Sequence, residues 1–234
     1  MKCVLRVIVF SLAAMAGSAY AGEISFVSFT GDSDVGISDA KTYTGAVRAW
    51  GGDLAINGVI FRGSDGNTAG NGVAGIIYAF PEANSYNGAN GNTGSFNAKG
   101  KVGEMLANTM VASNPKSVAV IAVKAETLAA GTTYDARIYL RSWDNNGARE
   151  LDFSFDEGTG KPVTTGVINV DKPSTIKAVK FTSNKQAYYI NYRYTAVEGK
   201  PLAITVTPKN NDNLHFYGFS NEVVPPAATT QPAK

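Results

Sequence analysis

The sequence has almost no cysteine and almost no histidine: Cys3 and His215 are the only examples among 234 residues. Structural and catalytic zinc sites are built from several such ligands, so zinc is disfavoured. A disulfide needs two cysteines, and a histidine relay has no second histidine here. The sequence also lacks a G-x-S-x-G elbow and a phosphate-binding glycine-rich loop. We therefore lean against an enzyme and expect no cofactor.

Long hydrophobic runs are also missing. The longest apolar stretch, Val7–Ala16, is too short to span a bilayer of about 30 Å, which takes about 20 residues, so we expect no membrane span. Lys2 and Arg6 precede it and Ala19-Tyr20-Ala21 follows it, which is the pattern of a secretory signal peptide. The sequence predicts a signal over residues 1–21 and a secreted, periplasmic or cell-surface protein.

The third feature that the sequence lacks is a net charge on the part that follows the signal. The chain has 21 Lys and Arg against 19 Asp and Glu, and the signal holds two of the basic residues and none of the acidic ones, so the mature chain has 19 − 19 = 0. Binding to nucleic acid or to an anionic membrane surface needs a basic patch. The composition argues against both partners, while uncharged ligands remain open. Cleavage after Ala21 also removes Cys3.

What the sequence does contain is apolar and polar alternation with period two, which is typical of strands with one face on a core. Short runs separated by Gly, Asn and Pro predict an all-β fold, a jelly-roll-type antiparallel β-sandwich over residues 22–223. Residues 224–234 predict a disordered Pro/Ala/Thr tail. The runs are Glu23–Thr30, Leu54–Phe61, Ser117–Ala125, Thr133–Trp143, Glu150–Asp156, Val163–Val170, Thr175–Thr182, Ala187–Thr195, Pro201–Thr207 and Leu214–Val223.

Two segments depart from this pattern. Lys101–Ala112 has apolar residues at helical spacing and ends before a proline, which predicts one short helix that caps the sandwich. Residues 62–100 are rich in Gly and Asn and predict a long loop, interrupted by Val73–Phe80 as a candidate strand. Tyr86 lies in this loop as an aromatic that either stacks on a ligand or pins the loop to the domain.

The parity of two neighbouring runs predicts a hairpin. Apolar residues fall at even positions of Thr133–Trp143 and at odd positions of Glu150–Asp156, with a turn-forming Asp-Asn-Asn-Gly between them. Aligning the two apolar faces puts Arg141 opposite Glu150 or Asp152. We interpret such a pair as register control rather than catalysis.

The same region resembles a known family. Leu128-Ala129-Ala130-Gly131-Thr132-Thr133-Tyr134, Tyr139-Leu140-Arg141-Ser142-Trp143 and Arg149-Glu150-Leu151-Asp152-Phe153 are similar to segments of galactose-binding-like and malectin-like jelly rolls of extracellular bacterial proteins. The closing residues 214–222 resemble the last strand of such modules. The resemblance implies an eight- to ten-stranded sandwich that either binds glycans through edge loops or serves as a structural module.

The candidate ligand-binding residues are three aromatic side chains and one arginine. Parity puts Tyr139, Arg141 and Trp143 on the polar face of one strand, and Tyr86 lies in the long loop. An exposed indole beside polar groups suits sugar stacking. The alternative is that the helix or the loop covers this face and buries them.

Asp32, Asp34 and Asp39 are the candidate metal ligands, because carboxylates two residues apart resemble the start of a calcium loop. The glycine and the closing glutamate of an EF-hand are not at their positions. A looser structural calcium site remains one interpretation, and turn formation by the Asx side chains is the other.

Three functions remain open. The first is a non-catalytic module that binds a glycan or a cell-envelope polysaccharide, and the second is a structural or envelope protein without a small ligand. The third is a jelly-roll glycosidase or lyase, for which Glu104, Glu150, Asp152 and Glu222 are the available carboxylates.

Overall fold

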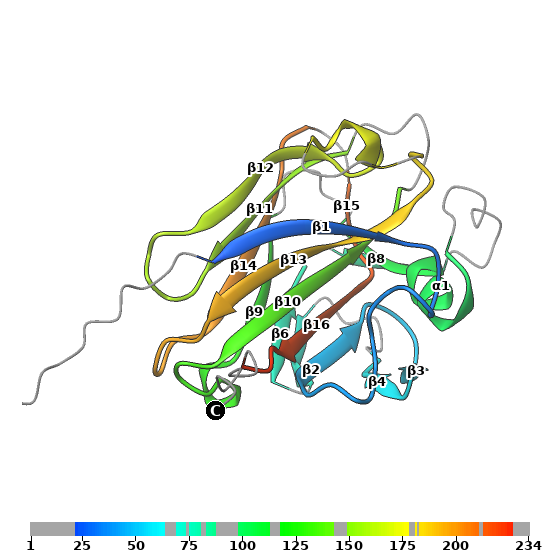
Figure 1. Cartoon of the computed structure of the whole chain (residues 1–234). Helices are drawn as coiled ribbons and strands as arrows, with labels where there is room; N and C mark the ends of the chain where they lie inside the picture. Colours follow the sequence, from blue (N-terminus) through cyan, green and yellow to red (C-terminus); the bar gives the residue numbers. More distant parts are fainter. Residues whose placement is uncertain are drawn as a thin grey trace, which may run out of the picture.

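The computed structural model describes residues 22–63, 69–73, 75–80, 83–87, 98–112, 118–142, 149–177, 181, 183–210 and 213–226. Two antiparallel sheets stack in a sandwich (Figure 1). Sheet A has the strand order β1 (Glu23–Phe29), β13 (Ala187–Thr195), β10 (Thr133–Leu140), β16 (Gly218–Val223), β2 (Tyr43–Arg48). Sheet B has the order β12 (Val163–Asn169), β11 (Glu150–Asp156), β14 (Leu202–Pro208), β9 (Ala119–Val123), β6 (Ile76–Ala79), β5 (Ala69–Val73).

Smaller elements close the ends of the sandwich. They are the hairpin β3 (Leu54–Ile56) and β4 (Val59–Phe61), the sheet β15 (Leu214–Phe216), β8 (Asn108–Ala112), β7 (Ala83–Asn87), the helix α1 (Gly100–Ala107), and the 3-10 turns η3 (Ala125–Thr127) and η4 (Pro173–Thr175). Within the described ranges, no helix is long and apolar enough to cross a membrane.

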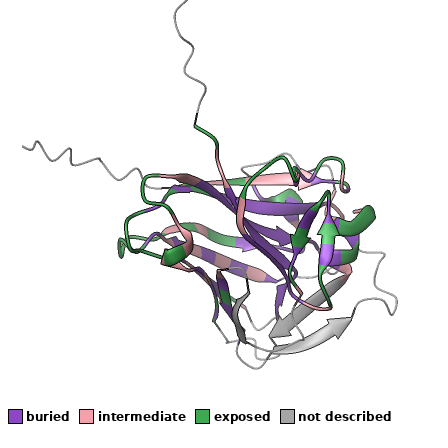
Figure 2. Ribbon diagram, turned by 90° about the horizontal axis from the view of Figure 1, so that it is seen from below, coloured by how far each residue is buried: buried purple, intermediate pink, exposed green. Residues whose placement is uncertain are grey.

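The core lies between the inner faces of the two sheets. Tyr192 of sheet A stacks on Phe155 of sheet B, with 4.5 Å between ring centroids. Ile138 and Ile190 of sheet A and Ile204 of sheet B are at most 2% exposed. Figure 2 shows this buried layer running between the sheets. The predicted all-β antiparallel sandwich with one helix is therefore confirmed.

Most of the predicted runs are strands with nearly the predicted bounds. Glu150–Asp156 and Ala187–Thr195 match without any shift. The Asn57-Gly58 step turns the chain between β3 and β4, and both residues adopt positive φ angles, 47° and 82°. Asn and Gly are the residues that tolerate this conformation, so the predicted run Leu54–Phe61 forms two strands joined by a tight turn.

The helix and the long loop differ from the predictions. The helix ends at Ala107 instead of Ala112, because residues 108–112 become β8 and pair with β7 and β15. Val102, Met105 and Leu106 are buried, as the helical spacing predicts. The described parts of the predicted loop contain β5, β6 and β7, and Val73–Phe80 divides into two strands at Gly75.

The predicted hairpin between the runs Thr133–Trp143 and Glu150–Asp156 is wrong. β10 lies in sheet A between β13 and β16, and β11 lies in sheet B between β12 and β14. Arg141 therefore faces neither Glu150, which lies opposite Asn169, nor Asp152, which lies opposite Val167 and Thr207. Parity identified the two faces of each strand, but it carries no information about which strand is the neighbour.

Two further differences concern single runs. Thr175 ends the 3-10 turn η4, and Ile176 and Lys177 are not in a strand, so the described part of Thr175–Thr182 is not β-structure. Conversely, β2 was not predicted, because Tyr43–Arg48 contains a glycine and too little alternation. This strand forms one edge of sheet A and positions the site described next.

Candidate functional site

The outer face of sheet A carries a row of charged and polar side chains. Asp135 of β10 lies opposite Arg193 of β13 and Glu222 of β16, and Arg137 lies opposite Asn191. These are the odd positions of β10, which point away from the core, as parity predicts. They are nevertheless enclosed: Asp135 is 4% exposed and Arg137 is 6% exposed.

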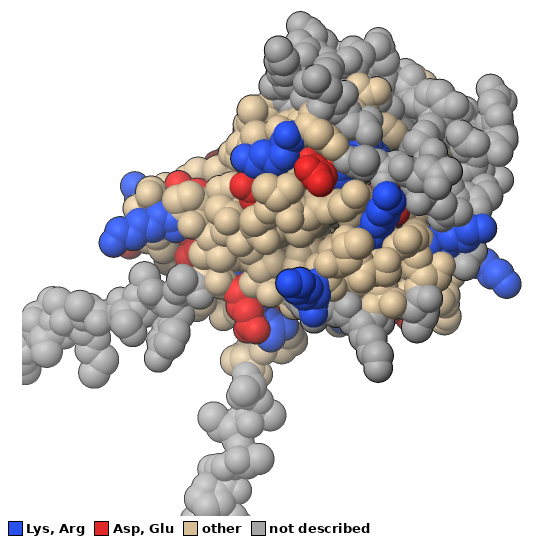
Figure 3. Space-filling model, turned by 90° about the horizontal axis from the view of Figure 1, so that it is seen from above, with Lys and Arg blue, Asp and Glu red and all other residues tan. Residues whose placement is uncertain are grey.

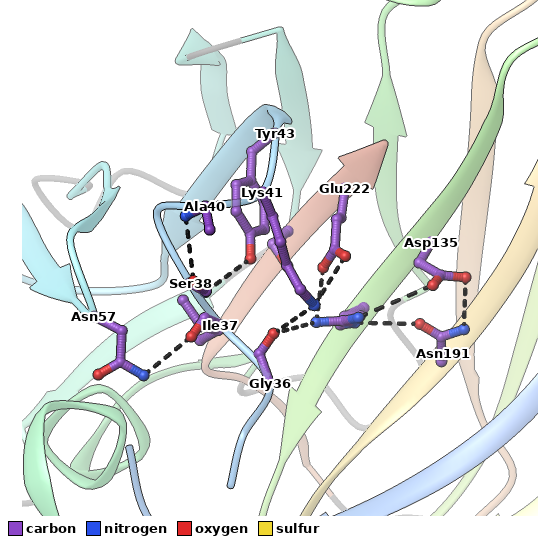
Figure 4. Close-up of polar contacts among 12 residues, drawn as sticks. Gly36, Ile37, Ser38, Ala40, Lys41, Tyr43, Asn57, Asp135, Asn191 and Glu222 are labelled. Carbon is purple, nitrogen blue, oxygen red and sulfur yellow. Dashed lines mark hydrogen bonds and ion pairs between the residues drawn. The ribbon is translucent and has the colours of Figure 1, made fainter. Parts of the chain in front are cut away.

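The segment between β1 and β2, residues 30–42, covers this row (Figure 4). Val35 and Ile37 are 0% and 3% exposed, because their side chains are buried in the same core cluster as the sheets. The carbonyl of Gly36 accepts a hydrogen bond of 3.2 Å from Arg137 Nη1. Asn57 Nδ2, from the β3–β4 turn, donates to the carbonyl of Ile37 at 3.0 Å. The segment is thus fixed to the sheet by both apolar and polar contacts.

Opposite charges within the row are paired. Glu222 is 2.9 Å from Arg137 Nη1 through Oε2 and 2.9 Å from Lys41 Nζ through Oε1. Asp135 accepts two hydrogen bonds from Arg193, of 2.9 and 2.8 Å. Breaking a buried pair of this kind leaves an uncompensated charge, which is strongly destabilising. The network therefore specifies where residues 30–42 and the end of β16 sit.

The network also sets protonation states. Burial alone would raise the pKa of Asp135, but hydrogen bonds from Arg193 and Asn191 and the charge of Arg137 outweigh it and hold that pKa below its ordinary value. Burial raises the pKa of the Tyr43 hydroxyl. At neutral pH the row thus consists of a carboxylate at Asp135 and a neutral hydroxyl at Tyr43.

A groove of about 350 Å³ opens beside β2 and β4, at the edge of this network. We call it the β2 groove. Its lining includes Asp39, Lys41, Tyr43, Thr44, Ile60 and Arg62.

The polar side chains of the β2 groove are held from beneath. The Lys41 side chain is 35% exposed in the groove, and its ammonium group contacts the buried Glu222. Tyr43 lies opposite Glu222 in the sheet, and its hydroxyl accepts a hydrogen bond from the Ser38 backbone at 3.3 Å. Ile60 adds an apolar surface and is 45% exposed.

This arrangement suits binding better than acid–base catalysis. Groups fixed before a ligand arrives lose little conformational freedom on binding, and apolar surface beside a few polar groups is typical of ligand sites. A glycosidase needs one protonated carboxyl group and a second carboxylate at a suitable distance. Glu222 forms ion pairs with Lys41 and Arg137, so its carboxylate is already engaged in holding the network together.

A second groove, of about 370 Å³, lies between β1, β12 and η4. Phe26 and Ile176 are among its apolar residues, and Thr165 and Asn169 are among its polar ones. The Thr165 hydroxyl bonds to backbone groups of Phe153 and Gly166, and the Asn169 side chain accepts from the backbone of the following turn. Its polar groups are therefore engaged in local structure.

Tyr139, a predicted ligand-binding residue, is 0% exposed. Its ring packs edge-on against Phe29, Phe61 and Tyr189, at centroid distances of 5.8 to 6.4 Å. Its hydroxyl is 2.9 Å from Ser220 Oγ. A ring without exposed surface cannot stack on a sugar, so for Tyr139 the alternative of burial holds, and the ring packs β4 against β1 and β13 of sheet A.

Arg141 is likewise 1% exposed, and its guanidinium group lies 5.4 Å from the centroid of the Tyr217 ring. It belongs to a second buried polar cluster, in which Arg149 and Asp171 form an ion pair and His215 Nδ1 is 3.2 Å from Tyr217 Oη. Burial, together with the charges of Arg149 and Arg141, lowers the pKa of His215 well below its ordinary value. Arg141 therefore does not form an exposed binding surface.

The other two predicted ligand residues are not placed by the structure. Trp143 lies outside the described residues. The backbone of Tyr86 is in β7 opposite Thr109, and its side chain is not described. A ligand contact by Trp143 or Tyr86 stays a prediction.

The three predicted calcium ligands lie in the segment over sheet A. Both oxygens of Asp32 accept backbone N–H groups at the start of α1, from Lys101 at 2.8 Å and from Val102 at 2.7 Å. The Asp34 carboxylate accepts from the Thr30 backbone and side chain and from the Gly31 backbone. Among the described residues, no group of three or more His, Cys, Asp or Glu is placed to hold a metal ion. Calcium binding stays a prediction.

On the face that Figure 3 shows, the described residues form no patch of one charge sign. Figure 3 shows basic and acidic side chains scattered over the described part of one face. Lys41 and Arg62 in the β2 groove each have an acidic partner, Glu222 and Asp53. The groove thus offers hydrogen bonds rather than a strong electrostatic field, which favours an uncharged polar ligand.

Sequence reasoning missed Lys41 and Tyr43 because the segment that carries them has no alternating pattern. Glu222 was identified only as one of several carboxylates. One sequence feature could nevertheless have indicated the site. Asp135 and Arg137 are charged residues at odd positions of β10, a strand long enough to cross the sheet. Charged residues on a central strand require partners, and these come from β16 and from residues 30–42.

A scan against models of known protein families finds no match, and a search of the curated proteins finds none. Solved structures do match. The CBM22-1 xylan-binding domain of Paenibacillus barcinonensis Xyn10C has a TM-score of 0.43 and 10% identity, covering 82% of this chain and 100% of that domain.

Two other matches also contain carbohydrate-binding modules. TmCBM61 in complex with β-1,4-galactotriose has a TM-score of 0.33 and 11% identity over 63% of this chain and 81% of that one. The CBM22-1–GH10 modules of Clostridium thermocellum Xyn10B, complexed with xylohexaose, have a TM-score of 0.36 and 13% identity over 68% of this chain and 28% of that one. At these TM-scores and identities, the likeness assigns no ligand to this chain.

Proposed function

We propose that this chain is an exported, non-catalytic protein that binds carbohydrate in the β2 groove. The observation that carries the proposal is the fixed position of Lys41 and Tyr43, which line the groove while contacting the buried Glu222 network. Hydroxyl-rich, uncharged ligands need directed hydrogen bonds beside apolar surface, and Ile60 supplies the apolar surface. The occupant is a glycan or a cell-envelope polysaccharide.

Export is supported by the first 21 residues. A basic flank, a short apolar run and Ala19-Tyr20-Ala21 together form a secretory signal, and the protein is secreted, periplasmic or held at the cell surface. A glycan ligand fits such a location. The resemblance of segments within residues 128–153 to galactose-binding-like and malectin-like modules implies either glycan binding or a structural role, and the first agrees with this proposal.

The test is retention on polysaccharides. The chain beginning at Gly22 is run on native affinity gels that contain xylan, galactan, glucan or peptidoglycan, and soluble oligosaccharides are then titrated by calorimetry. We expect one polysaccharide to retard the protein. Lys41→Met removes the ammonium group from the groove, and we expect it to weaken binding about tenfold or more, the size of one lost charged hydrogen bond.

Lys209→Met is the matched control. Lys209 is 37% exposed, close to the 35% of Lys41, and pairs with Asp152 on sheet B, away from the groove. It should bind like the unmodified chain. Loss of binding in Trp143→Ala with full binding by Lys41→Met would move the site to the residues around Trp143, and failure of the unmodified chain on all polysaccharides would reject carbohydrate binding.

A further inference from the structure

Gly22, the residue after the predicted cleavage position, is bonded to a buried carboxylate. Its backbone nitrogen donates to Glu157 Oε1 at 3.2 Å, and the Tyr192 hydroxyl donates to the same oxygen at 2.6 Å. Glu157 is only 7% exposed. The start of the mature chain is thus tied to the edge of the sandwich, more than a hundred residues away in sequence.

Glu157 has no cationic side chain as a partner in the described part of the molecule. Its hydrogen bonds come from two neutral groups, the Gly22 amide and the Tyr192 hydroxyl. The other buried carboxylates, Asp135, Asp171 and Glu222, each pair with an arginine. Burying a carboxylate without a cationic partner costs folding free energy. Of these four carboxylates, Glu157 is the one without such a partner among the described residues.

Packing fixes residue 22 beside this carboxylate. A Cβ atom at position 22 would overlap the Tyr192 ring. That ring has little freedom to move, because it stacks on Phe155 at 4.5 Å and on Tyr194 at 5.8 Å. Only glycine brings the backbone nitrogen this close to Glu157 without displacing the ring.

We propose that cleavage of the Ala21–Gly22 bond creates the missing charge. Water adds its hydroxyl to the Ala21 carbonyl, which becomes a carboxylate, and the released Gly22 nitrogen takes up the protons to become an α-ammonium group. This ammonium then forms an ion pair with Glu157. The inference rests on the export part of the proposed function and is independent of the ligand.

The consequence is that maturation strengthens the fold at its N-terminus. Before cleavage, residue 22 offers Glu157 one neutral N–H group; after cleavage it offers three N–H groups and a full charge. Hydrogen bonds in which the donor is ionised are about twice as strong as neutral ones. The precursor is therefore less stable than the mature protein, which keeps the chain more easily unfolded until export is complete.

The experiment compares three purified forms by urea denaturation at pH 7: one starting at Gly22 with a free amine, one acetylated at Gly22, and one starting at Tyr20. We expect the free-amine form to have a folding equilibrium constant about tenfold larger, or about 1.4 kcal/mol. Glu157→Gln should abolish that difference. Glu126→Gln, at a side chain 71% exposed, should leave it unchanged.

Mass spectrometry of protein recovered from the periplasm of a bacterial host supplies the second readout. A mature mass that begins at Gly22 supports the proposal, and another start site overturns it. Equal stability of the three forms overturns the ion pair even if cleavage is correct. Because the stability comparison uses purified chains, failure of export and failure of the ion pair give different results, and neither depends on glycan binding.

Discussion

The outer faces of the two sheets differ in how far they are exposed to solvent. On sheet A, residues 30–42 enclose a row of charged side chains, and Asp135 and Glu222 are each 4% exposed. On sheet B the corresponding face is open: Ile77 and Val120 are 40% and 39% exposed, beside the half-exposed Thr205. On the covered face, contacts fix the conformation of the side chains. On the open face, the side chains reach solvent and their conformations are less constrained.

This difference explains why the β2 groove, at the edge of sheet A, has polar side chains that are held from beneath. Lys41, at the end of the covering segment, and Tyr43, at the start of β2, line the β2 groove, and both contact the buried Glu222. On sheet B, the ion pair between Lys209 and Asp152 spans 3.6 Å at the surface. Exposed pairs of this kind contribute about 0–1 kcal/mol.

The largest expected effect comes from removing the central cation of the covered face. Arg137→Met leaves Glu222 and Asp135 buried with fewer partners, and we expect a loss of about 3–5 kcal/mol in the free energy of unfolding. Urea denaturation checks this value. Lys209→Met on the open face should cost less than about 1 kcal/mol. Similar losses in both variants would contradict the contrast between the faces.

Acid should weaken the covered face selectively. The folded-state pKa of Asp135 is lowered, so its contribution to stability is present above the unfolded value of about 3.9 and is lost as the pH falls through the folded pKa. We expect Asp135→Asn to flatten the decline in stability between about pH 4 and pH 2. Asp152→Asn is the matched control on sheet B. An unchanged acid profile in Asp135→Asn would refute this assignment.

A smaller effect is expected at the link between the cover and α1. Asp32→Ala removes the carboxylate that accepts the Lys101 and Val102 N–H groups, and losing a cap of this kind costs about 1 kcal/mol. Thermal unfolding with and without EDTA measures it and also tests calcium. If the loss appears only when calcium is present, Asp32 acts as a metal ligand instead of a cap.

The fold was largely predictable because strands with one buried face leave a period-two signal. The run Leu54–Phe61 was predicted as β-structure, and the structure divides it into β3 and β4 at Asn57-Gly58, where both residues have positive φ angles. The pairing of β10 was not predictable, because its alternation is equally compatible with any antiparallel neighbour. The strands that flank β10 in the sheet, β13 and β16, determine which carboxylate pairs with Arg137.

The candidate site was predictable only in part. Tyr139 was correctly placed on the polar face of its strand, but sequence does not show that residues 30–42 cover that face. Lys41 and Tyr43 lie where an irregular segment enters an edge strand, and such positions leave no periodic signal. Their role follows from long-range contacts with Glu222, about 180 residues later in the chain.

The most direct test of the account is an NMR titration of the isotope-labelled mature chain with the oligosaccharide that the polysaccharide panel identifies. We predict that the largest amide shifts fall on the β2 groove, at Tyr43, Thr44 and Ile60, and that Lys41→Met reduces them. Shifts confined to the open face of sheet B, or to residues around Trp143, would contradict the assignment of the groove.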